Sequence, residues 1–256
     1  MDLLFINCEK SVGKISLFLK KEFKKRNKQK AVLAISGGID SALTAYLCKK
    51  AGLDLYGIIL PYKGKGDEGK KIAEALDLPK DHIITIDIAP LVDTVAEQIN
   101  KFIELNHLDK GNIMARQRMV VQYALARNLN ALVVGTENLS EYYLGYFTLY
   151  GDQACDISPI SGLWKTQVRE LSKYLKLPNW VIEKDPSAGL WEDQTDEKEF
   201  GFTYHDADII LHSSKVLELS EEEIISRYNF NPELVDKVFE RVRVTEYKRE
   251  ESPKPS

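Results

Sequence analysis

The chain has 256 residues, of which 44% are hydrophobic and 29% charged, and its formal net charge is −4. This length and composition are typical of a globular protein with one large α/β core, and they exclude a chain that is disordered throughout. The acidic balance gives no general attraction to nucleic acid, and the sequence shows neither a secretory signal nor an apolar stretch that could span a membrane. We therefore expect a cytoplasmic protein that binds neither nucleic acid nor a membrane.

The cysteines and histidines give no sign of a disulfide framework or a metal centre. Cys8, Cys48 and Cys155 lie far apart, and no Cys-x-x-Cys pair occurs. The four histidines lack the spacing of metal ligands. A disulfide scaffold, a zinc ribbon and an iron–sulfur site are therefore not expected.

Apolar runs alternate with helical patterns along most of the chain. A first amphipathic helix is predicted from about Ser11 to Lys28, packed either on a sheet or on a partner chain. Strands are then expected at residues 31–35, 54–60, 82–88 and 131–136, and helices at 41–50, 68–78, 91–105 and 113–127, the last after a break at 109–112. This alternation predicts a doubly wound, mainly parallel sheet with helices on both faces, in a single domain spanning residues 1–256.

The C-terminal part is predicted to be helical beyond Asp206. Ser220 is expected to cap one of these helices, and Asn231-Pro232 to begin another. We expect these helices to cover an edge of the sheet. Residues 250–256 are predicted to be a frayed tail.

The segment Ser36-Gly-Gly-Ile-Asp-Ser41 joins the first predicted strand to the first crossover helix. Ligands of open α/β sheets bind at this position. The glycines permit left-handed backbone, and free amides at the helix start favour a phosphate group. Asp40 suits a phosphate site only with a cation between them, so the segment indicates a nucleotide bound with a divalent metal. The simpler alternative is a tight turn with a Ser or Asp N-cap.

This hexapeptide is not a Walker motif, because no Gly-Lys-Ser/Thr follows. It resembles the SGGxDS loop of the PP-loop ATP pyrophosphatases, whose fold is adenine nucleotide alpha hydrolase-like. Further motifs between about residues 31 and 205 are similar, in order and spacing, to those of ammonia-dependent NAD synthetases. They are Ala115-Arg116-x-Arg118-Met119, Gly135-Thr136, Ser140-Glu141, Gly145-Tyr-Phe-Thr148, Tyr150-Gly-Asp152, Asp156, Pro159-Ile160, Leu163-x-Lys165-x-x-Val168, Pro186-Ser-Ala-x-Leu190, and Gln194-x-Asp-Glu197 with Gly201 and Tyr204. Each motif alone is weak, but the ordered set is specific.

The resemblance implies an enzyme that amidates deamido-NAD in the final step of NAD biosynthesis. The nicotinate carboxylate would attack the α phosphorus of ATP, and ammonia would displace AMP from the resulting acyl adenylate. The chain has no room for a glutamine-hydrolysing domain, so free ammonia is the expected donor, although a separate amidotransferase subunit stays open. A homodimer and a Mg²⁺ ion are also implied.

Carried over residue by residue, the resemblance implies an ATP site, a metal site and a deamido-NAD site. The residues for ATP are Ala34, Ile35, Ser36, Gly37, Gly38, Ile39, Asp40, Ser41, Thr136, Lys165 and Ser187. Those for Mg²⁺ are Asp40 and Glu141, and those for deamido-NAD are Arg116, Leu149, Asp156, Tyr247 and Lys248. Asp152 would act near the ammonia, where a carboxylate can hold ammonium and accept its proton.

Ordinary structural roles compete with several of these assignments. Arg116 could form surface ion pairs, Asp152 could stabilise a turn, and Glu141 could be an exposed helix residue. Two positions also depart from the family pattern. Leu149 stands where many members have a lysine, and Tyr247 where they often have a histidine. The sequence therefore predicts altered or weaker binding of the dinucleotide, with the reaction type unaffected.

The segment 185–204 is predicted to be a mobile lid that excludes water from the adenylate. An acidic loop without function is the alternative. Two other functions compete with NAD synthesis. Another PP-loop ligase, either tRNA-modifying or GMP synthetase-like, would use the same loop, although a tRNA enzyme would favour a basic face. A non-catalytic ATP-binding module would not need Asp40 and Glu141 together.

Overall fold

The centre of the computed structural model, which describes residues 3–64, 66–187, 189 and 194–255, is a four-stranded parallel sheet. Its strands are β1 (Lys30–Ala34), β2 (Asp54–Ile59), β3 (Ile83–Thr85) and β4 (Leu132–Val133), in the order β3-β2-β1-β4. The registers pair Lys30 with Asp54, Gly57 with Ile83 and Ala31 with Leu132. The parallel pairing confirms the predicted sheet.

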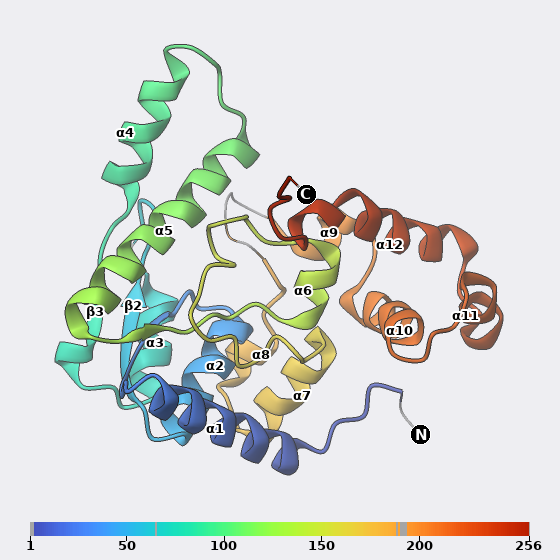
Figure 1. Ribbon diagram of the computed structural model, residues 1–256, viewed down its shortest axis with the longest axis horizontal. Coiled ribbons are helices and arrows are strands. Elements are labelled where there is room, and N and C mark those ends of the chain that lie inside the picture. The colour runs from blue at the N-terminus through green and yellow to red at the C-terminus, as the bar shows by residue number, and fades with distance from the viewer. Residues whose placement is uncertain (1–2, 65, 188, 190–193, 256) are drawn as a thin grey trace.

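Helices cover both faces of this sheet, as predicted for a doubly wound fold (Figure 1). In the described part of the chain, five helices bury their apolar residues in the core cluster on one face of the sheet. They are α1 (Cys8–Lys25), α2 (Ile39–Lys50), α3 (Asp67–Ala75), α7 (Lys165–Tyr174) and α8 (Asn179–Ile182). Helices α4 (Ala89–Asn100) and α5 (His107–Leu129) pack on the other face. A short 3-10 helix, η1 (Lys80–His82), precedes β3.

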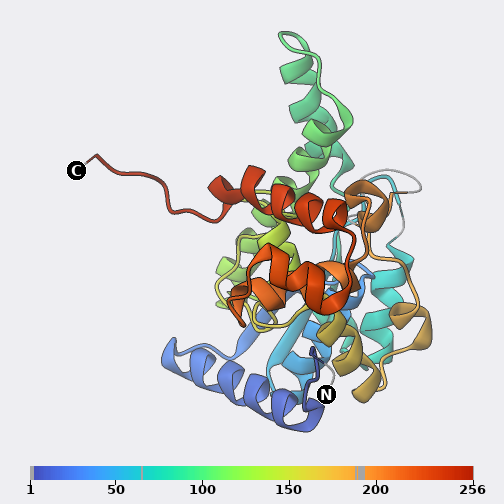
Figure 2. The same ribbon diagram turned by 90° about the vertical axis from the view of Figure 1, so that its right-hand side faces the viewer.

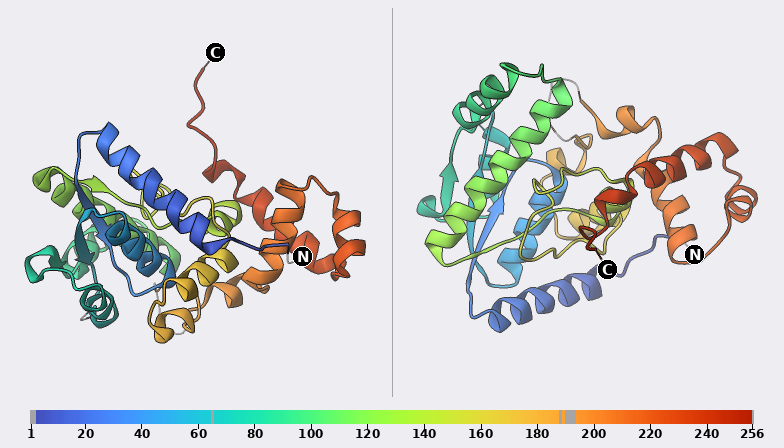
Figure 3. Two further views of the ribbon diagram at one scale, coloured as in Figure 1. Left: turned by 90° about the horizontal axis from the view of Figure 1, so that it is seen from below. Right: turned by 45° about the horizontal axis from the view of Figure 1, so that its top comes forward.

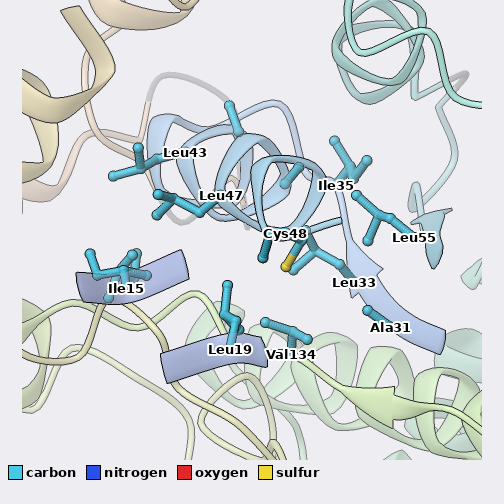
Figure 4. Close-up of a cluster of buried hydrophobic side chains, with 14 of the residues drawn as sticks. Ile15, Leu19, Ala31, Leu33, Ile35, Leu43, Leu47, Cys48, Leu55 and Val134 are labelled. Atoms are coloured by element: carbon cyan, nitrogen blue, oxygen red, sulfur yellow. The ribbon is translucent and has the colours of Figure 1, made fainter. Parts of the chain in front are cut away.

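The alternation of side chains along β1 divides the core into two layers. Leu33 and Ile35 join the cluster beneath α2, whereas Val32 joins the cluster beneath α5. Figure 4 shows the first cluster, in which Leu43, Leu47 and Cys48 of α2 lie between the strands and α1. Cys48 is fully buried, and burial raises the pKa of its thiol to about 12, so it serves as a small apolar core residue.

The apolar stripe of α1 lies inside this core. Val12, Ile15, Leu19 and Phe23 are all buried against the rest of the chain. Of the two alternatives for the first helix, packing on the sheet layers is therefore the one that the structure shows. Figure 3 shows α1 running along one side of the molecule.

The C-terminal helices form a second body beside the sheet layers. They are α6 (Leu139–Leu144), α9 (Asp196–Phe200), α10 (Tyr204–Lys215), α11 (Glu221–Tyr228), α12 (Pro232–Val244) and the 3-10 helix η2 (Glu246–Lys248). Together with Trp164 they enclose a cluster of their own, in which α10 packs mainly on α6 and α7. The expectation that they cover an edge of the sheet was wrong, because α6 and α7 lie between α10 and the strands.

Helix α5 corrects a second expectation. The predicted break at residues 109–112 lies inside this helix, which begins at His107. Asn106 accepts a hydrogen bond from the Asp109 amide, and the Asp109 side chain accepts one from the Asn106 amide, so the polar residues form a capping box. Gly111 is buried within the helix. Residues typical of a turn therefore start a helix here.

Helices α4 and α5 form an arm that projects from the body (Figure 2). Phe102 and Ile103, just beyond the end of α4, are 87% and 69% exposed. The chain after η2 runs away from the body, and residues 251–255 carry no helix or strand. No helix in the described part of the chain is long and apolar enough to cross a membrane.

Candidate active site

The loop after β1 is shaped by its own hydroxyl groups. Gly37 has φ +98°, a left-handed conformation that favours glycine, whereas Gly38 is extended and caps α2. The Ser41 hydroxyl donates to the Gly38 carbonyl at 2.9 Å, and the Gly38 amide donates to Ser36 Oγ at 3.2 Å. The first amides of α2 lack intrahelical acceptors, so they are available to an anion at this end of the sheet.

Helix α3 borders the same loop. Glu68, in its first turn, lies so close to Gly37 that a Cβ atom there would be 2.7 Å from the Glu68 carboxylate. Lys184, which precedes the predicted lid, forms an ion pair with Glu68. Helix α3, which follows β2, therefore adjoins the Ser36–Ser41 loop.

Asp40, Glu141 and Lys165 meet beside this loop. The Lys165 ammonium donates to Asp40 Oδ2 at 2.6 Å and to Glu141 Oε1 at 2.9 Å. Asn138 joins both acids, because its side-chain amide donates to Asp40 Oδ1 at 2.9 Å and its backbone amide donates to Glu141 Oε2 at 3.3 Å. The first turns of α2, α6 and α7 thus bring together three residues that lie far apart in sequence.

Burial makes this cluster strongly interdependent. Lys165 is 2% exposed, and the Asp40 and Glu141 carboxylates outweigh its burial and raise its pKa. Burial raises the pKa of Glu141, and the Lys165 ammonium opposes that rise. The lysine is therefore a fixed positive charge, and its presence lets two carboxylates share one small volume.

The two carboxylates are suited to a divalent ion that also binds phosphate oxygens. Mg²⁺ in nucleotide sites usually takes one or two protein carboxylates and completes its shell with water and phosphate. No group of three or more His, Cys, Asp and Glu side chains in the described ranges could hold a metal. The donor set here fits a metal that is shared with a nucleotide and does not fit a metal held by the protein alone.

A second acidic group lies after β4 and in the loop beyond α6. The Asp152 carboxylate accepts a hydrogen bond from the Thr148 amide at 2.8 Å, and burial raises its pKa. Burial also raises the pKa of Glu137 to about 8, with Glu141 and Asp152 adding to the rise and Lys248 opposing it. The Glu137 Oε1 atom is buried and has no hydrogen-bond partner among the residues that the structure describes. These residues place acidic groups next to the Asp40–Lys165–Glu141 cluster.

The residues predicted for deamido-NAD fall into two groups. Arg116 and Leu149 are in contact, since Arg116 Nε donates to the Leu149 carbonyl at 3.3 Å. Lys248 donates to the carbonyls of Gly145 and Phe147, each at 2.7 Å, and so ties η2 to the loop that carries Leu149. Tyr247 is 62% exposed and takes no part in that tie.

The remaining predicted residues lie after β4 and in the predicted lid. The Asp156 carboxylate accepts a hydrogen bond from the Val133 amide at 2.8 Å, and Thr136 lies three residues beyond the end of β4. Ser187 is exposed and accepts from the Gly189 amide at 3.0 Å. The predicted lid, 185–204, includes residues 188 and 190–193, which lie outside the described residues. At its base, the Asp196 amide donates to the Pro186 carbonyl at 3.0 Å.

Two residues next to the cluster were missed by sequence reasoning. Asn138 belongs to none of the predicted site motifs, although Asn138-x-x-Glu141 is the pattern of a helix capping box and could have revealed its role. Glu137 carried no such signal, because a glutamate after a short strand is ordinarily exposed. Its burial depends on the loop that returns from α6.

A family model described as NAD synthase matches residues 11–252. The chain belongs to the NAD synthase family. Among curated relatives, the NH(3)-dependent NAD(+) synthetase of Fusobacterium nucleatum is 42% identical over 253 residues, covering 97% of this chain and 96% of the relative. The enzyme of the same name from Pyrococcus furiosus is 42% identical over 248 residues, covering 95% and 93%. The predicted resemblance is confirmed.

Two solved structures share this fold. The NMN synthetase of Francisella tularensis aligns with a TM-score of 0.85 at 32% identity, covering 98% of this chain and 99% of that protein. An NH3-dependent NAD synthetase from Campylobacter jejuni aligns with a TM-score of 0.81 at 29% identity, covering 98% and 100%. The α/β fold class predicted from the sequence is thus confirmed over nearly the whole chain.

Proposed function

We propose that this chain catalyses the ATP-dependent amidation of deamido-NAD by ammonia, giving NAD, AMP and pyrophosphate. The observation that carries the proposal is the ion-pair cluster of Asp40, Glu141 and the buried Lys165 beside the Ser36–Ser41 loop. In a chain of the NAD synthase family, such a cluster suits the phosphates of ATP and the charge that develops on them. NAD biosynthesis would be completed by this step.

The chemistry explains why ATP is required. Ammonia cannot displace oxide from the nicotinate carboxylate. A carboxylate oxygen therefore first attacks the α phosphorus of ATP, and pyrophosphate leaves. Ammonia then attacks the acyl carbon, AMP departs with the carboxylate oxygen, and the nitrogen loses a proton. Positioning and charge neutralisation account for most of the catalysis in such transfers.

The residues have distinct tasks in this proposal. The loop amides and the Lys165 ammonium neutralise the triphosphate, with Thr136 and Ser187 as hydroxyl contacts. Arg116, Asp156 and Lys248 contact deamido-NAD. Asp152 receives the proton of the attacking nitrogen. Asp40 and Glu141 would hold a Mg²⁺ ion, which when bound withdraws charge from the phosphate oxygens.

A second candidate arises for the acceptor, which is the substrate whose carboxylate receives ammonia. Leu149 provides no ammonium at the acceptor end, and the structural neighbour from Francisella tularensis is named an NMN synthetase. Nicotinate mononucleotide carries the same reactive carboxylate but lacks the AMP half of deamido-NAD. We therefore include it as a competing substrate in the test below.

Three further features belong to this proposal. Residues 185–204 act as a lid, supported by the hydrogen bond between Asp196 and Pro186 at its base. Two copies form a homodimer through the arm of α4 and α5, where Phe102 and Ile103 are exposed. The protein acts in the cytoplasm, where its three free cysteines stay reduced.

The test is to incubate the purified protein with ATP, Mg²⁺ and ammonium, and with either deamido-NAD or nicotinate mononucleotide. Equimolar NAD, AMP and pyrophosphate from deamido-NAD would support the proposal. The mononucleotide as the better substrate by kcat/KM would favour the second candidate. If neither acceptor stimulates AMP release, another PP-loop ligase or a non-catalytic ATP-binding module gains support. Analytical ultracentrifugation of Phe102→Ser beside the unmodified chain tests the dimer.

A further inference from the structure

We infer that Asp208, on helix α10, is a positioning residue that fixes the Glu141 and Lys165 side chains relative to each other for ATP binding. It is fully buried and lies outside every motif that the sequence analysis singled out. This inference rests on the proposed function for the role of the cluster, but its central test requires only ATP binding.

The Asp208 carboxylate bridges the two segments that carry these side chains. Its Oδ1 atom accepts a hydrogen bond from the Ser140 hydroxyl, one residue before Glu141. Its Oδ2 atom accepts from the Thr166 amide at 2.9 Å and from the Thr166 hydroxyl at 2.8 Å, one residue after Lys165. A single side chain thus fixes the starts of α6 and α7 relative to each other.

Ser140 completes the hydrogen-bond network between α6, α7 and Asp208. Its hydroxyl oxygen accepts from the Lys165 backbone amide at 2.8 Å while its proton is donated to Asp208. Ser140 is itself fully buried, so water is not available to replace either bond. The backbone of Lys165 and that of Glu141 are therefore connected by hydrogen bonds that do not involve the ion pairs between their side chains.

The charge of Asp208 suits its position at the start of α7. The amides in the first turn of a helix lack partners and carry partial positive charge, which favours a carboxylate there. Lys165, as the first residue of α7, is unfavourably placed in the same field. Burial raises the pKa of Asp208 to about 6, with the Ser140 and Thr166 hydrogen bonds opposing the rise, so the group is mostly ionised at neutral pH.

Helix α10 contributes a second contact to the same lysine. Tyr204 lies one helical turn before Asp208, on the same face. Its ring centroid is 5.1 Å from the Lys165 ammonium, and its hydroxyl donates to Asp196 at 3.0 Å. One face of α10 therefore contacts both the backbone around Lys165 and its charged end.

The geometry specifies the decisive substitution. Asp208 accepts three hydrogen bonds, whereas the isosteric Asp208→Asn has only one acceptor oxygen. The Thr166 amide cannot reorient, so the new NH₂ group faces Ser140, whose oxygen already accepts from Lys165. We expect Asp208→Asn to weaken ATP binding at least tenfold and to lower kcat, because both segments shift. Asp206→Asn, on the same helix and partly exposed, serves as the matched control with unchanged values.

The experiment is titration calorimetry of each full-length variant with ATP and Mg²⁺ at 25 °C, beside a thermal melt and steady-state kinetics. Thr166→Val should weaken ATP binding, and Thr166→Ser, which keeps the hydroxyl, should restore it. These two variants and Ser140→Ala decide the matter if Asp208→Asn does not fold. Wild-type ATP affinity and kcat in a folded variant with a lowered Tm would overturn the inference, because Asp208 would then be purely structural.

The outcomes for function and for positioning are separable. If the unmodified chain amidates neither deamido-NAD nor nicotinate mononucleotide but Asp208→Asn still loses ATP affinity, the proposed function fails and the inference stands. If the unmodified chain makes NAD while Asp208→Asn binds ATP and turns over normally, only the inference fails.

Discussion

Lys165 Nζ lies 2.6 Å from Asp40 Oδ2, although 125 residues separate them in sequence. The pair forms because α2, which follows β1, and α7, which follows the loop beyond α6, begin at the same end of the sheet. Because Glu141 shares the same ammonium, hydrogen bonds hold the three side chains together as one charged unit. Such preorganised charge is effective on a reaction in which phosphate charge is redistributed.

Asp40→Asn tests this unit directly. The amide is nearly isosteric but removes one negative charge, so we expect kcat/KM to fall by about 100-fold or more and the Mg²⁺ requirement to weaken. Steady-state kinetics over a range of Mg²⁺ concentrations would measure both effects. Asp77→Asn is the matched control, because Asp77 also lies near a lysine, at 3.7 Å, but is 93% exposed. Undiminished Mg²⁺-dependent turnover in Asp40→Asn would remove Asp40 from the site.

Lys165→Met should lower stability in a pH-dependent way. Without the ammonium, Asp40 and Glu141 are close like charges in a partly buried site, and the loss is about 3 kcal/mol at neutral pH. The folded variant then binds protons more tightly than the unfolded chain, so its deficit relative to the unmodified protein shrinks as pH falls. Urea unfolding at pH 5.5 and 8 measures this. Lys173→Met, an exposed lysine on the same helix, should show no such trend. A deficit that grew at low pH would contradict the account.

Much of this arrangement could be predicted from the sequence. The apolar runs predicted the parallel sheet, and the glycine-rich loop after β1 predicted the end of the sheet at which Asp40, Lys165 and Glu141 meet. Polar residues at helix starts were harder to interpret. Residues 109–112 predicted a break before the helix, yet Asp109 closes the capping box of α5. Local composition does not distinguish a turn from a helix start, since both favour Asn, Asp and Gly.

Asp208 shows a second limit of sequence reasoning. Its neighbours Tyr204, Ala207 and Leu211 are spaced along one buried face of α10, so a carboxylate at 208 is an anomaly in an apolar stripe. That anomaly was visible in the sequence. Its partners were not, because Ser140 and Thr166 are 68 and 42 residues away and meet Asp208 only through the packing of α6, α7 and α10.

Leu149→Lys tests the departure from the family pattern at position 149, where many members have a lysine. Leu149 is partly exposed, and its backbone already contacts Arg116. An ammonium there should attract the phosphates of the dinucleotide and lower the KM for deamido-NAD by about tenfold, with kcat unchanged. The gain should diminish at high ionic strength. Leu149→Met controls for the change of side-chain shape. An unchanged KM in Leu149→Lys would show that this position does not contact the dinucleotide.

Glu137 should leave a signature in the pH dependence of stability. Its pKa is about 8 in the folded protein against 4.5 for an ordinary glutamate, because of its burial and the nearby Glu141 and Asp152. Between these values the folded protein holds a proton that the unfolded chain has lost. The free energy of unfolding therefore falls as pH rises from 4.5 to 8, by at most about 1.4 kcal/mol per pH unit from this group.

Glu137→Gln removes that titration and keeps the shape of the side chain. We expect the variant to gain stability relative to the unmodified protein as pH rises toward 8, and the difference to level off above that pH. Urea unfolding at intervals between pH 5 and 9 measures the trend, with Glu104→Gln at an exposed position as the control. Parallel curves for Glu137→Gln and the unmodified protein would mean that Glu137 ionises as it does in water. Glu137 would then add a negative charge near Asp152 at neutral pH, and this charge would make Asp152 a weaker acid by raising the pKa of its carboxyl group.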